Sequence, residues 1–194
     1  SWSVMWDPKY SGEILTFNNS RDAFGVAQYL LGYDVNSTNP DEWRAAEEKL
    51  KEQKPLIQSY VMDEVFNKME AGEAAMAPYY AGDYLTMKQE NDDLAFVYPK
   101  EGTNKFVDVM CIPSSSENKK AAELFINYMC EPEVALHNAN YLGYLCPVTA
   151  VLSDDRYEYK DNEVLYPKQE VKTQFFHNLD QDTLDLLSKL WEDL

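Results

Sequence analysis

The spacing of hydrophobic and polar residues changes between two periods along the chain, which predicts alternating strands and helices. Short apolar runs typical of buried strands occupy residues 12–17, 56–61, 74–80, 94–98 and 106–112. Apolar residues recur at helical spacing over residues 20–31, 40–54, 63–71, 116–130, 131–139 and 180–194. Strands that alternate with helices predict an α/β fold built on a layered sheet, because each element must bury its apolar face against a neighbour.

The ends of several predicted helices are marked by residues that favour a start or a stop. Gly32 and Gly72 follow the last apolar positions of the first and third helices, where glycine readily takes the left-handed conformation. Asn39 and Pro40 precede the second helix as its cap and first-turn residue. These signals predict helix boundaries close to the ones given above.

The charge balance restricts the classes of partner. The chain has 34 acidic and 17 basic residues, for a net charge of −17. Such a surface repels nucleic acid and anionic membranes and attracts cations, although most of the charge serves solubility. No apolar run approaches the roughly 18 residues that a membrane-spanning helix requires.

Signatures of enzymes, metal sites and disulfides are missing. Neither GxGxxG, a Walker loop, GxSxG nor HExxH occurs, and His137 and His177 lack metal-ligand spacing. Cys111, Cys130 and Cys146 are an odd number of cysteines without a CxxC pair, and their apolar sequence neighbours predict buried thiols. We therefore expect a protein that is not an enzyme and holds neither a metal nor a cofactor.

Acidic or amide residues next to aromatic residues could bind an organic polycation. Each ammonium group requires a carboxylate or carbonyl, and the methylenes between them pack against flat apolar walls such as aromatic rings. Three segments have this composition, namely Asn19 with Asp22, Tyr79 with Tyr80, and Phe106 with Asp108. The last two residues lie two apart, so on a strand they would share a face.

Each of these pairs also has a purely structural interpretation. Asn19 and Asp22 have the spacing of a capping pair at a helix start. Tyr79 and Tyr80 could be core aromatics. Asp108 lies among apolar residues, where an unpaired charge is costly, and a basic residue of the chain could neutralise it. An acidic hydrolase that uses Asp22 and Asp108 as paired carboxylates is a further alternative.

Several motifs resemble those of the bacterial spermidine/putrescine-binding periplasmic proteins, in the same order and at similar spacing. They are residues 1–12 (SWSVMWDPKYSG, like SW-x-x-LW-x-P-x-YKG), 31–33 (LGY), 72–73 (GE), 98–102 (YPKEG, like WPKEG), 112–113 (IP), 142–147 (LGYLCP, like GYPTP) and 165–167 (LYP). The resemblance runs through nearly all 194 residues. It implies a type 2 periplasmic-binding fold, in which two α/β lobes with helices on both faces of a sheet close on a ligand.

The resemblance also implies roles for individual residues. Asp108 and Asp22 match acidic residues that bind amines, the second of them usually Glu. Tyr80 and Phe106 match aromatic walls, both usually Trp. Tyr144 matches the tyrosine of a loop that crosses between the lobes.

Two further positions correspond to ligand residues of this family but carry a different amino acid. His177 falls near a ligand-facing Gln. Asn19 stands where the spermidine binders have Asp, so it can accept a hydrogen bond from an ammonium without adding charge. This difference leaves open the preference between spermidine and putrescine, and another cationic metabolite is the alternative ligand.

The resemblance implies that further residues precede the chain in the intact family. We expect residues 1–105 and 152–194 to belong to the second lobe and residues 106–151 to cross into the first lobe, which is truncated here. Residue 1 is then interior to a longer protein whose upstream part holds a signal peptide, a lipid anchor or a fused permease. The predicted function is extracytoplasmic capture of a polyamine for the membrane permease of an ABC importer.

Overall fold

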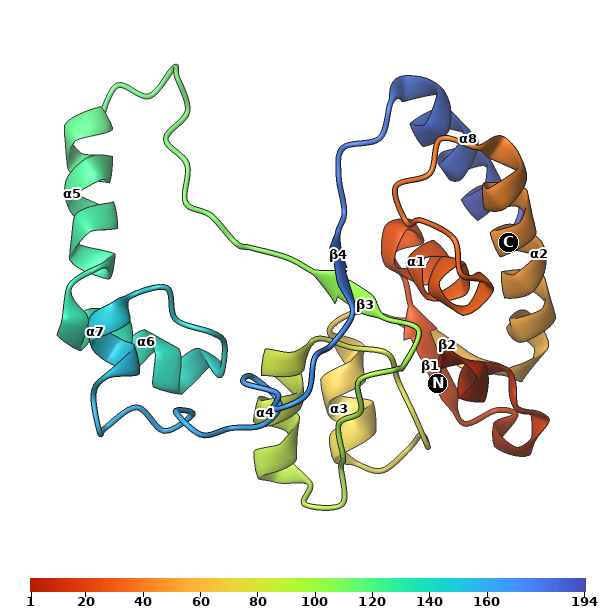
Figure 1. Cartoon of the computed structure of the whole chain (residues 1–194), viewed down its shortest axis with the longest axis horizontal. Coiled ribbons are helices and arrows are strands. Elements are labelled where there is room, and N and C mark those ends of the chain that lie inside the picture. Colours follow the sequence, from red (N-terminus) through yellow and green to blue (C-terminus); the bar gives the residue numbers. More distant parts are fainter. The chain divides into compact units, whose positions relative to one another are not determined.

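The computed structural model describes all residues 1–194 and divides them into two compact units (Figure 1). Unit 1 contains Ser1–Tyr80, Met87–Phe106 and Glu170–Leu194, and unit 2 contains Ala81–Thr86 and Val107–Gln169. Both units therefore draw on segments that are far apart in the sequence. The assignment of these segments to the lobes of an intact protein stays a prediction.

Unit 1 combines short strands with helices. Its strands are β1 (Ile14–Phe17), β2 (Ile57–Val61), β3 (Thr103–Lys105) and β4 (Thr173–Phe175). Its helices are α1 (Ser20–Leu31), α2 (Pro40–Gln53), α3 (Glu64–Glu70) and α8 (Gln181–Glu192), with 3-10 turns η1 (Trp2–Trp6), η2 (Pro8–Tyr10) and η3 (Lys54–Leu56). α4 (Ala81–Glu90) begins in unit 2 and ends in unit 1.

The strands of unit 1 form two parallel pairs. β1 pairs with β2, with a register shift between Ile14 and Leu15. A single bridge joins Ile14 to Met76, so the predicted strand over residues 74–80 is reduced to this one contact. β3 pairs with β4 from Thr103 opposite Thr173. Parallel pairing requires a crossover between the strands, and α1 with α2 supplies it between β1 and β2.

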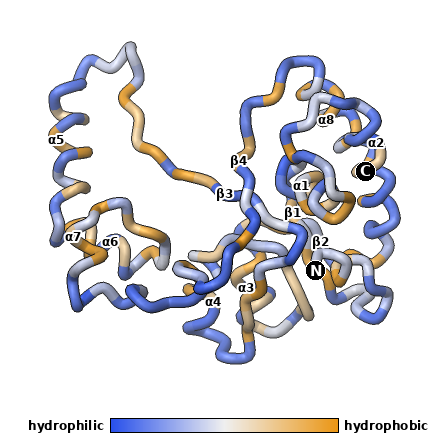
Figure 2. The backbone as a smooth tube through the Cα atoms, in the orientation of Figure 1, coloured by the Kyte–Doolittle hydropathy of each residue, from blue (hydrophilic) through white to orange (hydrophobic).

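The main core of unit 1 lies between α1, α2 and α8. Its buried members are Phe24, Ala27, Trp43, Ala46, Leu50, Leu187 and Leu190. These are the apolar stripes that helical spacing predicts, and the hydrophobic segments of the three helices are visible in Figure 2. The core fixes α1, and α1 in turn provides one wall of the site described below.

The predicted ends of α1 and α2 are confirmed. Asn19 caps α1, and Gly32 ends it at a φ of 75°. Asn39 caps α2 through a hydrogen bond from the Asp41 amide, and Pro40 occupies the first turn. Local side-chain chemistry is sufficient to set these boundaries, since each cap satisfies backbone groups that the helix leaves unpaired.

Unit 2 contains α5 (Lys119–Met129), α6 (Pro132–Leu142), α7 (Thr149–Leu152) and the first part of α4. Its core gathers residues from α4, α6, α7 and the segment that follows α7. The buried members are Leu85, Ala135, Leu136, Ala139, Val151, Tyr157, Tyr159 and Leu165. α5 instead leaves the apolar side chains of Leu124, Phe125 and Tyr128 exposed.

Two strand predictions and the burial of the cysteines are wrong. Residues 94–98 and 106–112 form no strand. Val107 and Val109 are 69% and 74% exposed, and Cys111 shares the exposure of that segment. An apolar run shows only a preference, and a strand also needs a neighbour to pair its backbone groups. Cys130 is likewise exposed and Cys146 is half-buried.

Candidate ligand-binding pocket

Unit 1 contains a small pocket beside the first part of α1. Its lining combines aromatic rings with a few polar groups, and consists of Trp2, Phe17, Asp22, Gly25, Val26, Tyr29, Tyr79, Tyr80, Thr103, Asn104 and Phe176. Its volume of about 30 Å³ corresponds to about two water molecules. The pocket is therefore suited to the end of a ligand and not to a whole metabolite.

Asp22 provides the negative charge of the pocket. The Tyr80 hydroxyl donates a hydrogen bond to its Oδ2 at 3.0 Å, and the Asn104 amide donates one to its Oδ1 at 3.3 Å. Burial raises the pKa of the Asp22 carboxyl, and the Tyr80 hydrogen bond and the nearby Arg21 charge oppose this shift. The carboxylate thus lies in surroundings that favour the arrival of a cation.

No basic side chain forms a salt bridge with Asp22. The neighbouring Arg21 directs its guanidinium elsewhere, to the Val35 carbonyl at 2.7 Å and to Asn36 Oδ1 at 2.9 Å. It also lies over the Phe176 ring, 4.6 Å from the centroid. The direct partners of the Asp22 carboxylate are therefore neutral donors, and no cation of the protein contacts it.

A cluster of aromatic rings forms the apolar side of the pocket. Tyr80 packs against Phe17 and Tyr79, with ring centroids 5.6 and 5.0 Å apart. Phe106 meets Tyr80 edge to face at 5.5 Å and stays 44% exposed. Rings in such an arrangement offer flat faces to methylene groups and an electrostatic attraction to an ammonium.

At the start of α1, the structure assigns helix capping to Asn19 and a place in the pocket to Asp22. Asn19 caps the helix, since its Oδ1 accepts hydrogen bonds from the amides of Arg21 and Asp22. The Asp22 side chain does not take part in this cap and lies in the pocket instead. Asp22, Tyr80 and Phe106 are thus brought together by contacts through Tyr80, whereas Asn19 is next to them in a structural position.

His177 lies at the surface of unit 1. Its side chain is exposed, and its backbone amide donates a hydrogen bond to Asn36 Oδ1 at 2.7 Å. Phe176, the preceding residue, lines the pocket. The role of His177 in binding stays a prediction.

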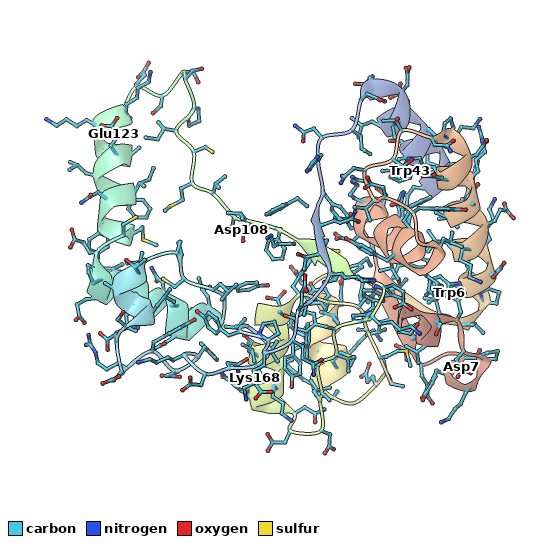
Figure 3. All side chains as sticks on the ribbon, viewed as in Figure 1. Trp6, Asp7, Trp43, Asp108, Glu123 and Lys168 are labelled. Atoms are coloured by element: carbon cyan, nitrogen blue, oxygen red, sulfur yellow. The ribbon has the colours of Figure 1, made fainter.

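Asp108 and Tyr144 belong to unit 2. Asp108 lies on the segment between β3 and α5 (Figure 3), is exposed, and forms no salt bridge. The Tyr144 hydroxyl donates to Oδ1 of Asp83 at 3.0 Å, and burial followed by the Asp83 charge raises its pKa. The Tyr144 ring lies against Gly82, where an added Cβ would be 2.2 Å from it.

Several residues of the pocket were not predicted from the sequence. Asn104 is in a short polar strand with no distinguishing signal, and Tyr29 looks like one more apolar position of α1. Trp2 lies in the first of the quoted motifs, and its indole donates to the Gly102 carbonyl at 2.7 Å. Only the fold shows that these side chains line one pocket with Asp22.

Two other types of feature are not found in the structure. It contains no group of three or more His, Cys, Asp or Glu placed to hold a metal ion. It also contains no helix of the length and apolar character that crossing a membrane demands.

Residues 1–165 match the model of a family described as bacterial extracellular solute-binding protein. The spermidine/putrescine-binding periplasmic protein of Escherichia coli strain K12 is 32% identical over 170 residues, which are 88% of this chain and 49% of the relative. The chain thus spans about half the length of this curated relative.

Solved structures agree with this match. The spermidine/putrescine ABC transporter substrate-binding protein PotD of Streptococcus pneumoniae superposes with a TM-score of 0.83 at 30% identity, covering 99% of this chain and 60% of that one. The PotD lipoprotein of Treponema pallidum has the same fold, with a TM-score of 0.81 at 19% identity and coverage of 100% and 60%. The predicted periplasmic-binding-protein fold is confirmed.

Proposed function

Because this chain belongs to the family of bacterial extracellular solute-binding proteins, we propose that it captures a polyamine outside the cytoplasm for an ABC importer. The related proteins are named for binding spermidine and putrescine and for a periplasmic location. Capture is binding and release of the ligand without a chemical reaction. The paired-carboxylate hydrolase is therefore not proposed further.

The observation that supports a polyamine most directly is that the Asp22 carboxylate is partly buried and has no salt bridge. Its carboxylate is partly buried, accepts hydrogen bonds only from Tyr80 and Asn104, and has no salt bridge. A buried anion without a counter-charge is costly, and a ligand ammonium removes that cost by supplying both charge and hydrogen-bond donors.

The surroundings of Asp22 favour a ligand that is both cationic and hydrocarbon. The rings of Phe17, Tyr79, Tyr80 and Phe106 form one aromatic cluster beside the carboxylate. The net charge of −17 attracts cations to the protein at low salt. A neutral sugar would use the rings and leave the Asp22 charge uncompensated.

The other predicted ligand residues enter the proposal through the sequence resemblance. Asp108 supplies a second carboxylate, and Tyr144 a further aromatic contact. His177 and Asn19 contribute polar groups. The docking partner is the membrane permease of the importer, either as a separate polypeptide or fused to this one.

Titration calorimetry on the full natural polypeptide tests the proposal. Spermidine and putrescine are titrated separately, with a neutral disaccharide as the control ligand. We expect saturable heat with at least one of the polyamines and none with the sugar. Binding of the sugar without binding of either polyamine would overturn the proposal.

A different cationic metabolite is the second candidate ligand. It is favoured by Asn19, which stands where the spermidine binders have an acidic residue, and by Tyr80 and Phe106 in place of the usual Trp. A thermal-shift screen of mono-, di- and polyamines, guanidinium compounds and quaternary ammonium compounds separates the two. The largest shift is expected with a diamine or triamine if the polyamine proposal holds.

A further inference from the structure

One polar group of the pocket has no partner within the protein. The Tyr29 side chain is only 7% exposed, and its hydroxyl oxygen is buried without any hydrogen bond. Native proteins pair nearly all such groups, because a buried hydroxyl that loses its hydrogen bonds to water without replacement destabilises the fold. The Tyr29 hydroxyl therefore requires a partner from outside the chain.

The helix geometry directs this hydroxyl toward Asp22. Asp22, Gly25, Val26 and Tyr29 follow at i, i+3, i+4 and i+7, so they share one face of α1, and all four line the pocket. Side chains on a helix lean toward its N-terminus, which brings the Tyr29 ring toward the turn that holds Asp22.

Gly25 lets the Phe176 ring approach this face of α1 closely. It lies between Asp22 and Tyr29 in the sequence of α1 and has no side chain. A Cβ at this position would meet the Phe176 ring at 2.9 Å, so the ring lies directly over the glycine. Asp22, Tyr29 and the Phe176 ring thus line one pocket on this face of α1.

We propose that the Tyr29 hydroxyl is a ligand contact that accepts a hydrogen bond from the primary ammonium bound at Asp22. This inference rests on the proposed function and adds a specificity-determining residue to it. A primary ammonium has three N–H donors, so it can serve Asp22 and Tyr29 together. An N,N-dimethylated ammonium has one donor and greater bulk, and a pocket with room for about two water molecules accommodates it poorly. The pocket therefore selects primary over alkylated amine ends.

The protonation state of Tyr29 is compatible with this role. Burial, with the Asp34 charge as the next cause, raises its pKa to about 12. The phenol therefore stays neutral at physiological pH and keeps lone pairs that can accept a hydrogen bond from a cation.

Calorimetry with Tyr29→Phe in the full natural polypeptide tests the inference. The two ligands are putrescine and its N,N,N′,N′-tetramethyl derivative. We expect Tyr29→Phe to weaken putrescine binding about tenfold, as for loss of one hydrogen bond to a charged group. The tetramethyl derivative should bind weakly to both proteins with little difference between them. Tyr33→Phe is the matched control, because Tyr33 follows the same helix but does not line the pocket, and it should leave both affinities unchanged.

Ligand-free stability distinguishes a ligand contact from a structural group. Tyr29→Phe should unfold at the same temperature as the wild type or above it, because it removes a buried hydroxyl that has no partner in the protein. Lower stability with unchanged putrescine affinity would show a trapped water as the partner and overturn the inference. An equal loss of affinity for both ligands would overturn it as well. If the wild type binds no polyamine, the proposed function itself fails.

Discussion

The Tyr80 hydroxyl donates a hydrogen bond to Asp22 Oδ2 at 3.0 Å and so joins the start of α1 to the segment before α4, 58 positions away. The bond holds the carboxylate beside the aromatic cluster and opposes the effect of burial on its pKa. Asp22 and Tyr80 are therefore coupled. Substitution of Asp22 is expected to alter the charge of the pocket, and substitution of Tyr80 is expected to alter the pKa of that charge.

Replacing the charge of Asp22 should separate affinity from stability. Asp22→Asn is expected to weaken polyamine binding about 10- to 100-fold, since a charge-assisted hydrogen bond contributes roughly 1.5–3 kcal/mol. Without ligand, the variant should be at least as stable as the wild type at neutral pH, because the ionised carboxylate is costly to bury. Calorimetry and thermal unfolding measure the two effects. Asp93→Asn, an exposed position in the same unit, is the control and should change neither.

The stability difference should also depend on pH with a defined sign. The pKa of Asp22 in the folded protein is raised above its unfolded value, so the cost of its charge is full at high pH and disappears as the group is protonated. The advantage of Asp22→Asn should therefore shrink as pH falls through the raised pKa toward about 4. An advantage that grows on acidification would contradict the burial of an uncompensated charge.

Removing the Tyr80 hydroxyl should shift the pH dependence of binding. Tyr80→Phe keeps the ring but removes the hydrogen bond that lowers the pKa of Asp22, so this pKa should rise further. Since the ammonium binds the ionised carboxylate, affinity should be lost at a higher pH in the variant than in the wild type as the solution is acidified. Calorimetry over a pH series gives the two midpoints. Coincident midpoints would mean that the hydrogen bond does not influence the titration.

Gly82 should be intolerant of a side chain because of Tyr144. A Cβ there would overlap the Tyr144 ring at 2.2 Å, so Gly82→Ala should displace the ring and lower the free energy of unfolding by about 1–3 kcal/mol. The same change should cost less in a Tyr144→Ala background, where alanine even favours the helix over glycine by about 1 kcal/mol. Denaturant unfolding of the four proteins measures this coupling. If the effects of the two substitutions on the free energy of unfolding are additive, the Tyr144 ring does not lie against Gly82.

Asp108 should contribute to binding without contributing to stability. It is exposed and forms no salt bridge, so Asp108→Asn should leave thermal unfolding of the ligand-free protein unchanged. If it binds a ligand amine, the variant should lose about tenfold or more in polyamine affinity. Asp161→Asn is a matched exposed control in the same unit. Wild-type affinity in Asp108→Asn would remove this residue from the site.

Elements with local signals could be predicted from the sequence. The ends of α1 and α2 follow from Asn19, Gly32 and Asn39, because a cap or a left-handed glycine acts on backbone groups within one turn. The family match likewise follows from motif order along the chain. The same motif order suggests Asp22 and Tyr80 as ligand residues.

Which side chains lie together depends on the packing of distant segments and could not be predicted from the sequence. Residues 106–112 have an apolar pattern but remain without a neighbouring strand, since pairing depends on partners that the pattern does not specify. The pocket brings Trp2, Asp22, Tyr29 and Asn104 together from distant segments, and the unpartnered hydroxyl of Tyr29 exists only in that arrangement. Burial and hydrogen bonding are properties of the packed molecule, and these properties distinguish a ligand contact from an ordinary residue of a helix face.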